Sequence, residues 1–199
     1  KVTLLNCSVF ALLFQIFVVN LWYINIICLM EDAIIPYELP EVENHSFFFI
    51  DQQVEVNLEA KLHQHDAWEL YYVVHGQGNR IAGDTLQPFT AGDVVLIPPS
   101  MIHRWEYNAD STDEEGHVRY LMVAFSHSLL ERCIEVFPEL RNRLSGVQFP
   151  TDALKFGLES SRIIRRILSE INEMDELERL SAMFRLLPVI FTSSDYTLA

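Results

Sequence analysis

The stretch of residues 63–107 constrains the fold of this chain more than any other part of its sequence. It begins HQHDAWELYYVVHGQG and ends AGDVVLIPPSMIHRWEY. If the first block is a single strand, its alternation between two faces sends His63, His65 and Glu69 to the same face. A later strand that returns antiparallel would bring His103 back to them. The sequence therefore predicts that these imidazoles and the carboxylate meet between two strands.

Neutral imidazoles and a carboxylate are common ligands of divalent transition metals. If His63, His65, Glu69 and His103 hold an ion, the set favours Zn, Ni, Fe or Mn over calcium. The alternative is that the polar groups satisfy one another through hydrogen bonds, without a metal. The sequence leaves both interpretations open.

The spacing of these residues forms a two-part pattern. In the first part, His-x-His is followed after three residues by Glu69 and after six more by Gly76. In the second part, Gly92 is followed after five residues by Pro98 and after four more by His103. Glycine and proline at these places indicate turns at the ends of strands.

This spacing resembles the two-part signature of the cupin family. The resemblance implies a mainly β chain with a cupin-like double-stranded β-helix, or jelly-roll barrel, and the four polar side chains near its mouth. Tyr71 shares the strand face of Glu69 and is a candidate wall residue of a ligand pocket. Trp105 shares the face of His103 and is a second candidate. The second part of the pattern is incomplete, because Ser100 stands where cupins usually have Gly.

After Phe125 the hydrophobic period changes from two to about 3.6, which predicts helices. A capping box from Ser128 to Glu131 is expected to begin the first helix, and Pro138 to end it. A later helix has an apolar stripe of Ile163, Ile164, Ile167, Leu168, Ile171 and Met174.

The last predicted helix carries an apolar stripe with spacings of three and four residues, typical of a coiled-coil seam. The stripe contains Leu177, Leu180, Phe184, Leu187 and Phe191. We expect Pro188 to bend or shorten this helix. Because a helix pair outside a closed barrel has a second apolar side to cover, we also expect a homodimer.

A cupin barrel followed by an amphipathic helical pair resembles the N-terminal half of AraC-type transcriptional regulators. The similarity rests on the two blocks of the barrel signature and on LERLSAMFRLL late in the chain. It implies a barrel that binds a small-molecule effector, for example a sugar, and that dimerises. It also implies a separate C-terminal domain with two helix-turn-helix units that binds DNA. No such domain is visible in this chain, and the polar residues 193–199 are expected to begin a linker to it.

Charge and cysteine content agree with a sensor domain of this kind. Fourteen basic residues against twenty-eight acidic ones give a formal charge of −14, so the chain by itself should not grip DNA. Only Cys7, Cys28 and Cys133 are present, too few for a disulfide framework or a multi-Cys zinc site. The expected compartment is the reducing cytoplasm.

Residues 2–30 contain no Lys, Arg, Asp or Glu and are long and apolar enough to span a bilayer as a helix. The sequence from Met30 onward resembles the N-terminus of an ordinary soluble protein. We therefore favour Met30 as the physiological start, which implies no membrane contact, with a membrane anchor as the alternative. The expected organisation is an apolar segment at 1–30, a barrel at 31–125, a helical dimerisation region at 126–192 and a linker at 193–199.

The competing class is a metal-dependent cupin enzyme, such as a dioxygenase or an isomerase. In that case His63, His65, Glu69 and His103 would hold iron or manganese and leave positions open for substrate and oxygen. The incomplete second block and the long helical region favour the regulator, so we assign no catalytic residue.

Overall fold

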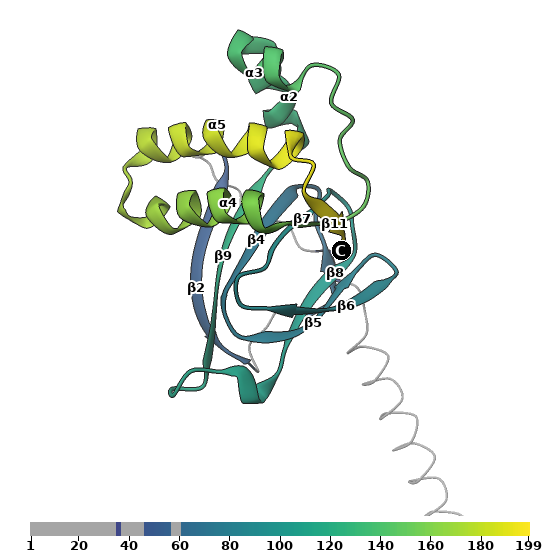
Figure 1. Ribbon diagram of the computed structural model, residues 1–199, viewed down its shortest axis with the longest axis vertical. Helices are drawn as coiled ribbons and strands as arrows, with labels where there is room; N and C mark the ends of the chain where they lie inside the picture. The colour runs from purple at the N-terminus through teal and green to yellow at the C-terminus, as the bar shows by residue number, and fades with distance from the viewer. Residues whose placement is uncertain (1–34, 37–45, 57–60) are drawn as a thin grey trace, which may run out of the picture.

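The computed structural model describes residues 35–36, 46–56 and 61–199 (Figure 1). The apolar run before Met30 lies outside the described residues, and so do the predictions of the start site and of a membrane anchor. Within the described part of the chain, no helix has both the length and the apolar character needed to cross a membrane.

The strands form two sheets that enclose a barrel. They are β1 (Ile35–Pro36), β2 (Phe48–Glu55), β3 (His63–Gln64), β4 (Trp68–His75), β5 (Gln77–Ala82), β6 (Thr85–Thr90), β7 (Val94–Ile97), β8 (His103–Tyr107), β9 (His117–Phe125), β10 (Leu154–Phe156) and β11 (Tyr196–Leu198). The five-stranded sheet has the order β1-β3-β8-β5-β6, and the six-stranded sheet has the order β11-β10-β7-β4-β9-β2.

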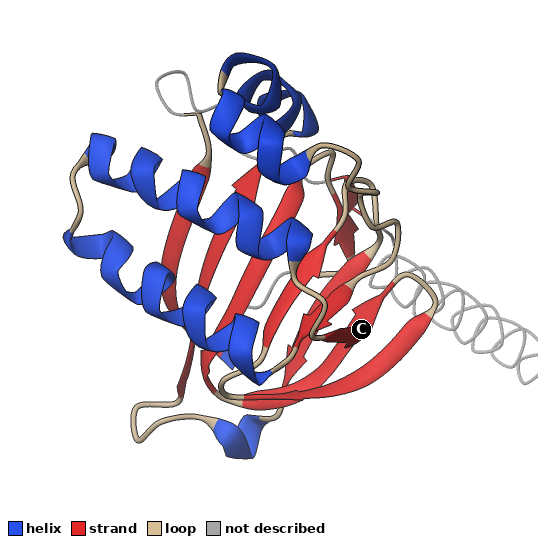
Figure 2. Cartoon of the chain, turned by 45° about the horizontal axis from the view of Figure 1, so that its top comes forward, coloured by secondary structure: helices blue, strands red, loops and turns tan. Residues whose placement is uncertain are grey.

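The helices follow the barrel strands along the chain. They are α2 (His127–Val136), α3 (Pro138–Leu144), α4 (Leu158–Glu170) and α5 (Glu176–Thr192), with short 3-10 helices η2 (Ala109–Ser111) and η3 (Ile171–Glu173). Helices α4 and α5 lie side by side across one face of the six-stranded sheet (Figure 2). The predicted fold class, a mainly β barrel followed by an amphipathic helical pair, is confirmed.

Strand β4 separates two hydrophobic cores because its side chains alternate between the faces of the sheet. Trp68 and Leu70 belong to a core that continues into α4 and α5. Tyr71 and Val73 belong to a second core that fills the barrel between the two sheets. Both faces of this strand are therefore buried, and the helical pair covers the outer one.

The hairpin and the buried strand that the sequence predicted are both present. Strands β5 and β6 pair antiparallel across the turn at Gly83, which has φ +59°, a value that favours glycine. All of β7 is buried, as expected for a continuous apolar run in the middle of a sheet.

The first helix begins earlier than predicted. Its N-cap is Ser126, whose hydroxyl accepts a hydrogen bond from the backbone N–H of Leu129 at 3.1 Å, so the predicted capping box at Ser128 is wrong. Pro138 follows the end of α2 and occupies the first turn of α3, where its missing N–H has no helical partner to lose. Pro188 does not shorten α5, which continues to Thr192.

The predicted stripe of α5 is correct only toward its C-terminal end. Leu187 and Phe191 are buried in the core, whereas Leu177 at the other end is 76% exposed. The buried residues of α5 are Ala182, Met183, Leu186, Leu187, Ile190 and Phe191. The predicted seam therefore leaves the core and reaches the surface near the start of the helix.

The segment expected to begin a linker contains a strand. Strand β11 pairs with β10, so residues 196–198 extend the six-stranded sheet. Helix α4 begins after Gly157, which offers no side-chain cap. The Asp195 carboxylate instead accepts hydrogen bonds from the Ser160 N–H at 3.0 Å and from the Ser160 hydroxyl. The C-terminal segment thus caps a helix that lies far from it in the sequence.

We expect Asp195→Ala to lower the free energy of unfolding by roughly 1 kcal/mol, because it removes the acceptor at the α4 N-terminus. Urea denaturation followed by circular dichroism measures the change. Asp152→Ala, at an exposed position in the loop before β10, is the matched control. Equal losses in the two variants would show that Asp195 does not cap α4.

Candidate functional site

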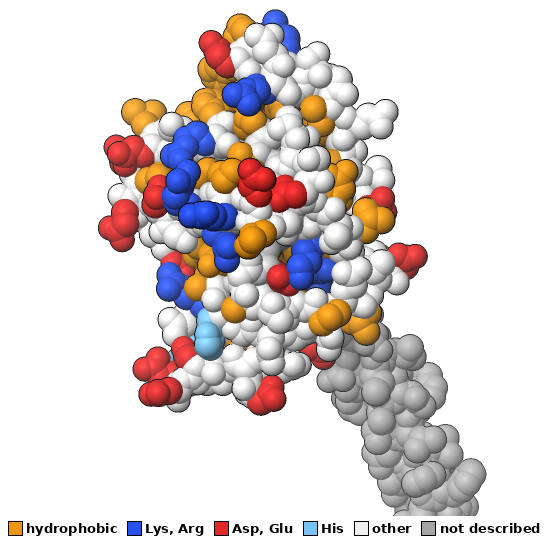
Figure 3. All heavy atoms as spheres, viewed as in Figure 1, with side chains coloured by type: hydrophobic (Ala, Val, Ile, Leu, Met, Phe, Trp, Pro, Cys, Tyr) orange, Lys and Arg blue, Asp and Glu red, His pale blue; other side chains and the backbone are white. Residues whose placement is uncertain are grey.

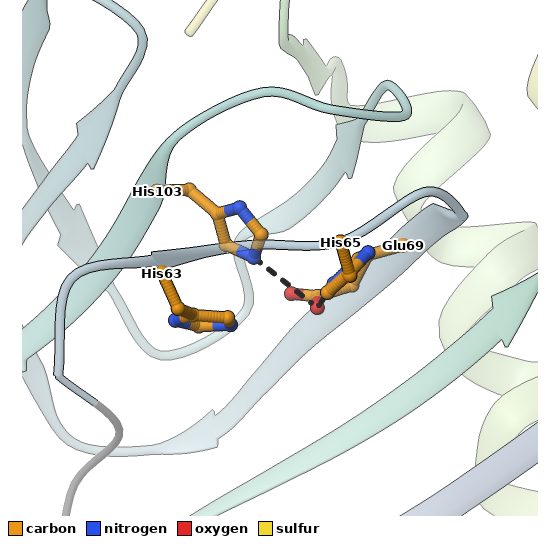
Figure 4. A group of neighbouring side chains, drawn as sticks. All are labelled: His63, His65, Glu69 and His103. Carbon is orange, nitrogen blue, oxygen red and sulfur yellow. Dashed lines mark hydrogen bonds and ion pairs between the residues drawn. The ribbon is translucent and has the colours of Figure 1, made fainter. Parts of the chain in front are cut away.

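Four polar side chains from both sheets meet inside the barrel (Figure 4). His63 in β3 and His103 in β8 are direct partners in the five-stranded sheet. Glu69 comes from β4 of the six-stranded sheet, and His65 lies in the link between β3 and β4. One potential ligand atom from each residue lies within 4.8 Å of those of the others. The structure therefore brings together the residues that the sequence grouped by spacing.

The route by which they converge differs from the expected single strand. Strand β3 ends at Gln64 and β4 begins at Trp68 in the other sheet, so the chain crosses between sheets at His65. The Ser100 N–H donates to the His65 carbonyl at 2.8 Å and holds this crossing. Ser100 has φ +62°, in the left-handed region that favours glycine, which explains physically why this position is usually Gly in the cupin pattern.

Glu69 is the centre of the cluster. Its Oε2 accepts a hydrogen bond from His65 Nε2 at 3.0 Å, and both side chains are almost fully buried. His103 Nε2 lies 3.4 Å from the same oxygen. That second contact has the distance of an ion pair but is not aligned as a hydrogen bond, since His103 Nε2 has no hydrogen-bond partner among the described residues.

Backbone carbonyls orient two of the imidazoles. His63 Nδ1 lies 2.8 Å from the Lys61 carbonyl, and His103 Nδ1 lies 2.8 Å from the Met101 carbonyl. Because a carbonyl only accepts, Nδ1 carries the hydrogen in each ring, an assignment made from the hydrogen-bond partner. In the neutral ring Nε2 is then the nitrogen that carries the lone pair, which is the tautomer that metal-binding imidazoles use.

The charges in the cluster are coupled. Burial alone would raise the pKa of Glu69, but the attraction of His103 and the hydrogen bond from His65 outweigh burial and hold this pKa well below its usual range. Burial opposes the charged form of His103, yet the Glu69 carboxylate raises the pKa of this imidazole. Burial and the neighbouring His103 lower the pKa of His63. The site thus holds a carboxylate beside one imidazole whose pKa is raised, His103, and another whose pKa is lowered, His63.

The donor set fits a divalent transition metal. His63 and His103 have the carbonyl partners that orient metal-binding imidazoles, and Glu69 is already in the deprotonated form that a metal needs. His65 Nδ1 is buried and has no hydrogen-bond partner among the described residues. The chemistry of the site therefore suits the ions named from the sequence, while occupation by a metal stays a prediction.

The two predicted wall residues stack on each other in the barrel. The rings of Tyr71 and Trp105 are 4.0 Å apart with 13° between their planes, and Tyr120 stacks on the other side of Tyr71 at 4.7 Å. Phe89 meets Trp105 edge to face at 5.0 Å. The Tyr71 hydroxyl lies 3.1 Å from that of Tyr107. Aromatic rings with a few polar groups are the usual lining of a small-molecule site.

Sequence reasoning missed Arg80, which lies in β5 and is fully buried. It is the direct cross-strand partner of Trp105, and its guanidinium carbon lies 5.4 Å from the centre of the Trp105 ring. Strand alternation could have indicated its burial, because Gly78, Arg80 and Ala82 alternate with exposed or half-buried residues along β5. The hairpin pattern alone does not say which of its faces is inside the barrel.

Without metal, we expect Glu69→Gln to destabilise the chain by roughly 1–3 kcal/mol, because it removes the negative charge that faces the buried imidazoles of His65 and His103. The raised His103 pKa stabilises the fold fully below the ordinary value of 6.5 and loses this contribution as the pH rises through the raised pKa. The lowered Glu69 pKa acts oppositely, because its contribution is fully present above the ordinary value of 4.5 and is lost only as the pH falls below that value. The loss should therefore be largest between these values and smaller at about pH 9.

Urea denaturation in EDTA across this pH range, with Glu106→Gln at an exposed position as control, measures the difference. A loss that is independent of pH would contradict the coupling between Glu69 and His103.

Comparison with known proteins identifies the family. The description "AraC-like ligand binding domain" matches residues 48–187, from β2 into α5. Among solved structures, an apo variant of ToxT from Vibrio cholerae is 14% identical, with a TM-score of 0.50, over 75% of this chain and 55% of ToxT. A cupin 2 conserved barrel protein from Salinispora arenicola is 22% identical over 48% of this chain and 76% of its own, with a TM-score of 0.35.

Oxalate decarboxylase from Bacillus subtilis is 16% identical over 43% of this chain and 22% of its own, with a TM-score of 0.33. No curated protein matches the sequence. At 14% identity, the similarity to ToxT concerns the fold alone. The family match spans the barrel and most of the helical pair, and the chain belongs to the AraC-like ligand-binding domain family.

Proposed function

We propose that this chain is the effector-binding and dimerisation part of an AraC-type transcriptional regulator of the cytoplasm. The observation that carries the proposal is the extent of the family match, which includes both the barrel and the helices that cover it. The aromatic and polar lining of the barrel supports a small-molecule effector, for example a sugar or another small metabolite. DNA binding would reside in a separate C-terminal domain.

Hydrogen bonds between β6 and the C-terminal residues support a role of the C-terminal segment in transmitting ligand binding. The Thr85 hydroxyl donates to the Ala199 carbonyl at 2.9 Å, and Gln87 Nε2 donates to the Leu198 carbonyl at 3.4 Å. Both donors belong to β6, on the edge of the five-stranded sheet. A ligand that shifts β6 would therefore shift the segment that leads toward a following domain. A coupling of roughly 1–3 kcal/mol is enough for such regulation.

Dimerisation would use the exposed end of the α5 stripe. Leu177 is 76% exposed, and a groove of about 480 Å³ between α3 and α5 has Phe137, Leu140, Phe184 and Pro188 in its lining. Figure 3 shows hydrophobic side chains gathered over this helical end of the molecule. Apolar surface of this kind on a soluble domain favours a protein partner, and an isologous homodimer is the commonest one.

A metal-dependent cupin enzyme is the second candidate, and the cluster at Glu69 favours it. In that role His63, His65, Glu69 and His103 would hold the metal, which would supply Lewis acidity to a bound substrate. The match to a ligand-binding domain of regulators favours the first candidate.

The regulator proposal is tested with the native gene, including any coding sequence after the codon for Ala199. We expect that sequence to encode a helix-turn-helix domain. A compound that raises the melting temperature of this chain should then change expression from a promoter bound by the full protein about 5- to 150-fold. Stoichiometric iron or manganese with substrate-dependent oxygen consumption, and no effect on transcription, would instead support the enzyme.

We expect Leu177→Ser to raise the dimer dissociation constant at least about tenfold, because it removes an apolar side chain from the proposed interface. Sedimentation equilibrium measures this constant. Leu158→Ser is the matched control, since Leu158 on α4 is 82% exposed and lies outside the α5 stripe. A monomeric native chain, or equal effects of the two changes, would contradict the proposed interface.

A further inference from the structure

Arg80 is a cation buried in the barrel with most of its hydrogen-bonding capacity unused. Its side chain is inaccessible to solvent. One nitrogen, Nη2, donates to Gln87 Oε1 at 3.3 Å. Nε and Nη1 have no hydrogen-bond partner among the described residues, and neither has the indole Nε1 of Trp105. Because Arg80 and Trp105 are direct partners across β5 and β8, these unused donors belong to one small region of the barrel wall.

The charge of Arg80 has no partner in the described part of the chain. Glu69 is engaged by His65 and His103. Asp93 attracts Arg80 electrostatically, but its Oδ2 already accepts from Lys155 Nζ at 2.7 Å and from the Thr90 N–H at 3.2 Å. No carboxylate of the described residues forms an ion pair with Arg80. The carboxylates of Glu69 and Asp93 therefore interact with other residues.

A structural role does not account for such an arginine. Burial lowers the pKa of Arg80, yet a guanidinium keeps its proton in proteins. A buried charge without a partner destabilises a fold, and an apolar side chain of similar size in its place is often neutral or stabilising. The contact with the Trp105 ring uses the electron-rich face of the indole but leaves the N–H groups of the guanidinium unused. A ligand that brings an acceptor would complete the site.

We propose that Arg80 and the Trp105 indole N–H bind a carboxylate group of the effector. The inference rests on the proposed function, because it names the chemistry of the ligand that the barrel would sense. A carboxylate carries a single negative charge, which the single guanidinium neutralises, and charge-assisted hydrogen bonds to guanidinium groups are among the strongest in proteins. A phosphate dianion would leave a second charge without a partner in the dry interior. The rest of the effector would face the rings of Tyr71 and Phe89, which both contact Trp105.

Gln87 connects this carboxylate site to the C-terminal strand. It accepts from Arg80 through Oε1 and donates to the Leu198 carbonyl through Nε2. A carboxylate that draws the guanidinium toward itself competes with Gln87 for Nη2. Binding of a carboxylate would therefore change the hydrogen bond between Gln87 and β11.

The test uses the full chain in EDTA, so that carboxylates cannot act through a metal. Acetate, hexanoate, benzoate and galacturonate are compared with the neutral compounds hexanol, benzamide and galactose, by thermal melting and by titration calorimetry. At least one carboxylate should raise the melting temperature, and its neutral counterpart should not. Inorganic phosphate should have no effect.

Arg80→Met should weaken carboxylate binding at least about tenfold, because it removes a charge-assisted contact. The control Arg104→Met, on the neighbouring strand β8, should leave binding unchanged. In the absence of ligand, Arg80→Met should melt at the native temperature or above it, which a structural arginine would not allow. If Arg80→Met does not fold, Arg80→Lys should fold and bind carboxylates more weakly, because it keeps the charge without the planar fork.

Equal affinity in the native chain and in the Arg80 variants would overturn the proposal, and so would the absence of any carboxylate effect. Binding of neutral galactose by the native chain and by Arg80→Met alike would also overturn it, while the regulator proposal would stand. Carboxylate binding that depends on Arg80 but never alters transcription would keep the site and remove the regulator proposal.

Discussion

The central strands β4 and β7 of the six-stranded sheet are almost entirely buried on both faces, and much of the fold follows from this burial. The strand register places Leu70 beside Leu96 on the outer face and Tyr71 beside Val95 on the inner face. All are buried in their respective cores. Exposure of such an apolar outer face to water would cost free energy. Helices α4 and α5, which cover this face, are therefore required for the stability of the barrel itself. The helical region is thus part of the same folding unit as the strands with which it packs.

The inner core differs from the outer one because it contains charged groups. Glu69 is balanced there by His65 and His103, which satisfy its charge by direct contact. Arg80 and Trp105 retain donors that nothing in the described chain accepts. The barrel therefore holds one polar cluster in which opposite charges face one another and a second one whose donors have no acceptor among the described residues. Open donors in a dry interior give a site its selectivity, because any ligand without matching acceptors leaves them unsatisfied.

The C-terminal strand links these interior groups to the helices. Asp195 caps α4, while Leu198 and Ala199 accept hydrogen bonds from the β6 hairpin strand. The C-terminal segment, residues 195–199, consequently contacts both the barrel and the helical pair. If an effector binds at Arg80 as proposed, this arrangement would transmit a change at Arg80 to the C-terminal segment without a large movement of the sheets.

Short-range patterns in the sequence were enough to predict several features of the structure. Alternation and turn residues identified the β5–β6 hairpin and the buried strand β7, and the spacing of His63, His65, Glu69 and His103 identified residues that do meet. Periodicity likewise identified the helices after Phe125. These features are local, since a strand or helix period and a glycine turn are set by the residues that carry them.

Which face of each strand or helix is buried became clear only from the tertiary structure. His65 was predicted in a strand but lies where the chain crosses between the sheets. Residues 196–198, predicted as part of a linker, form β11 of the six-stranded sheet. The tertiary structure also exposes Leu177 and encloses Arg80. An alternating strand has two faces, and an amphipathic helix can tilt its stripe. Which of these faces is buried depends on chain segments far away in sequence that pack against it, and no local pattern contains that information.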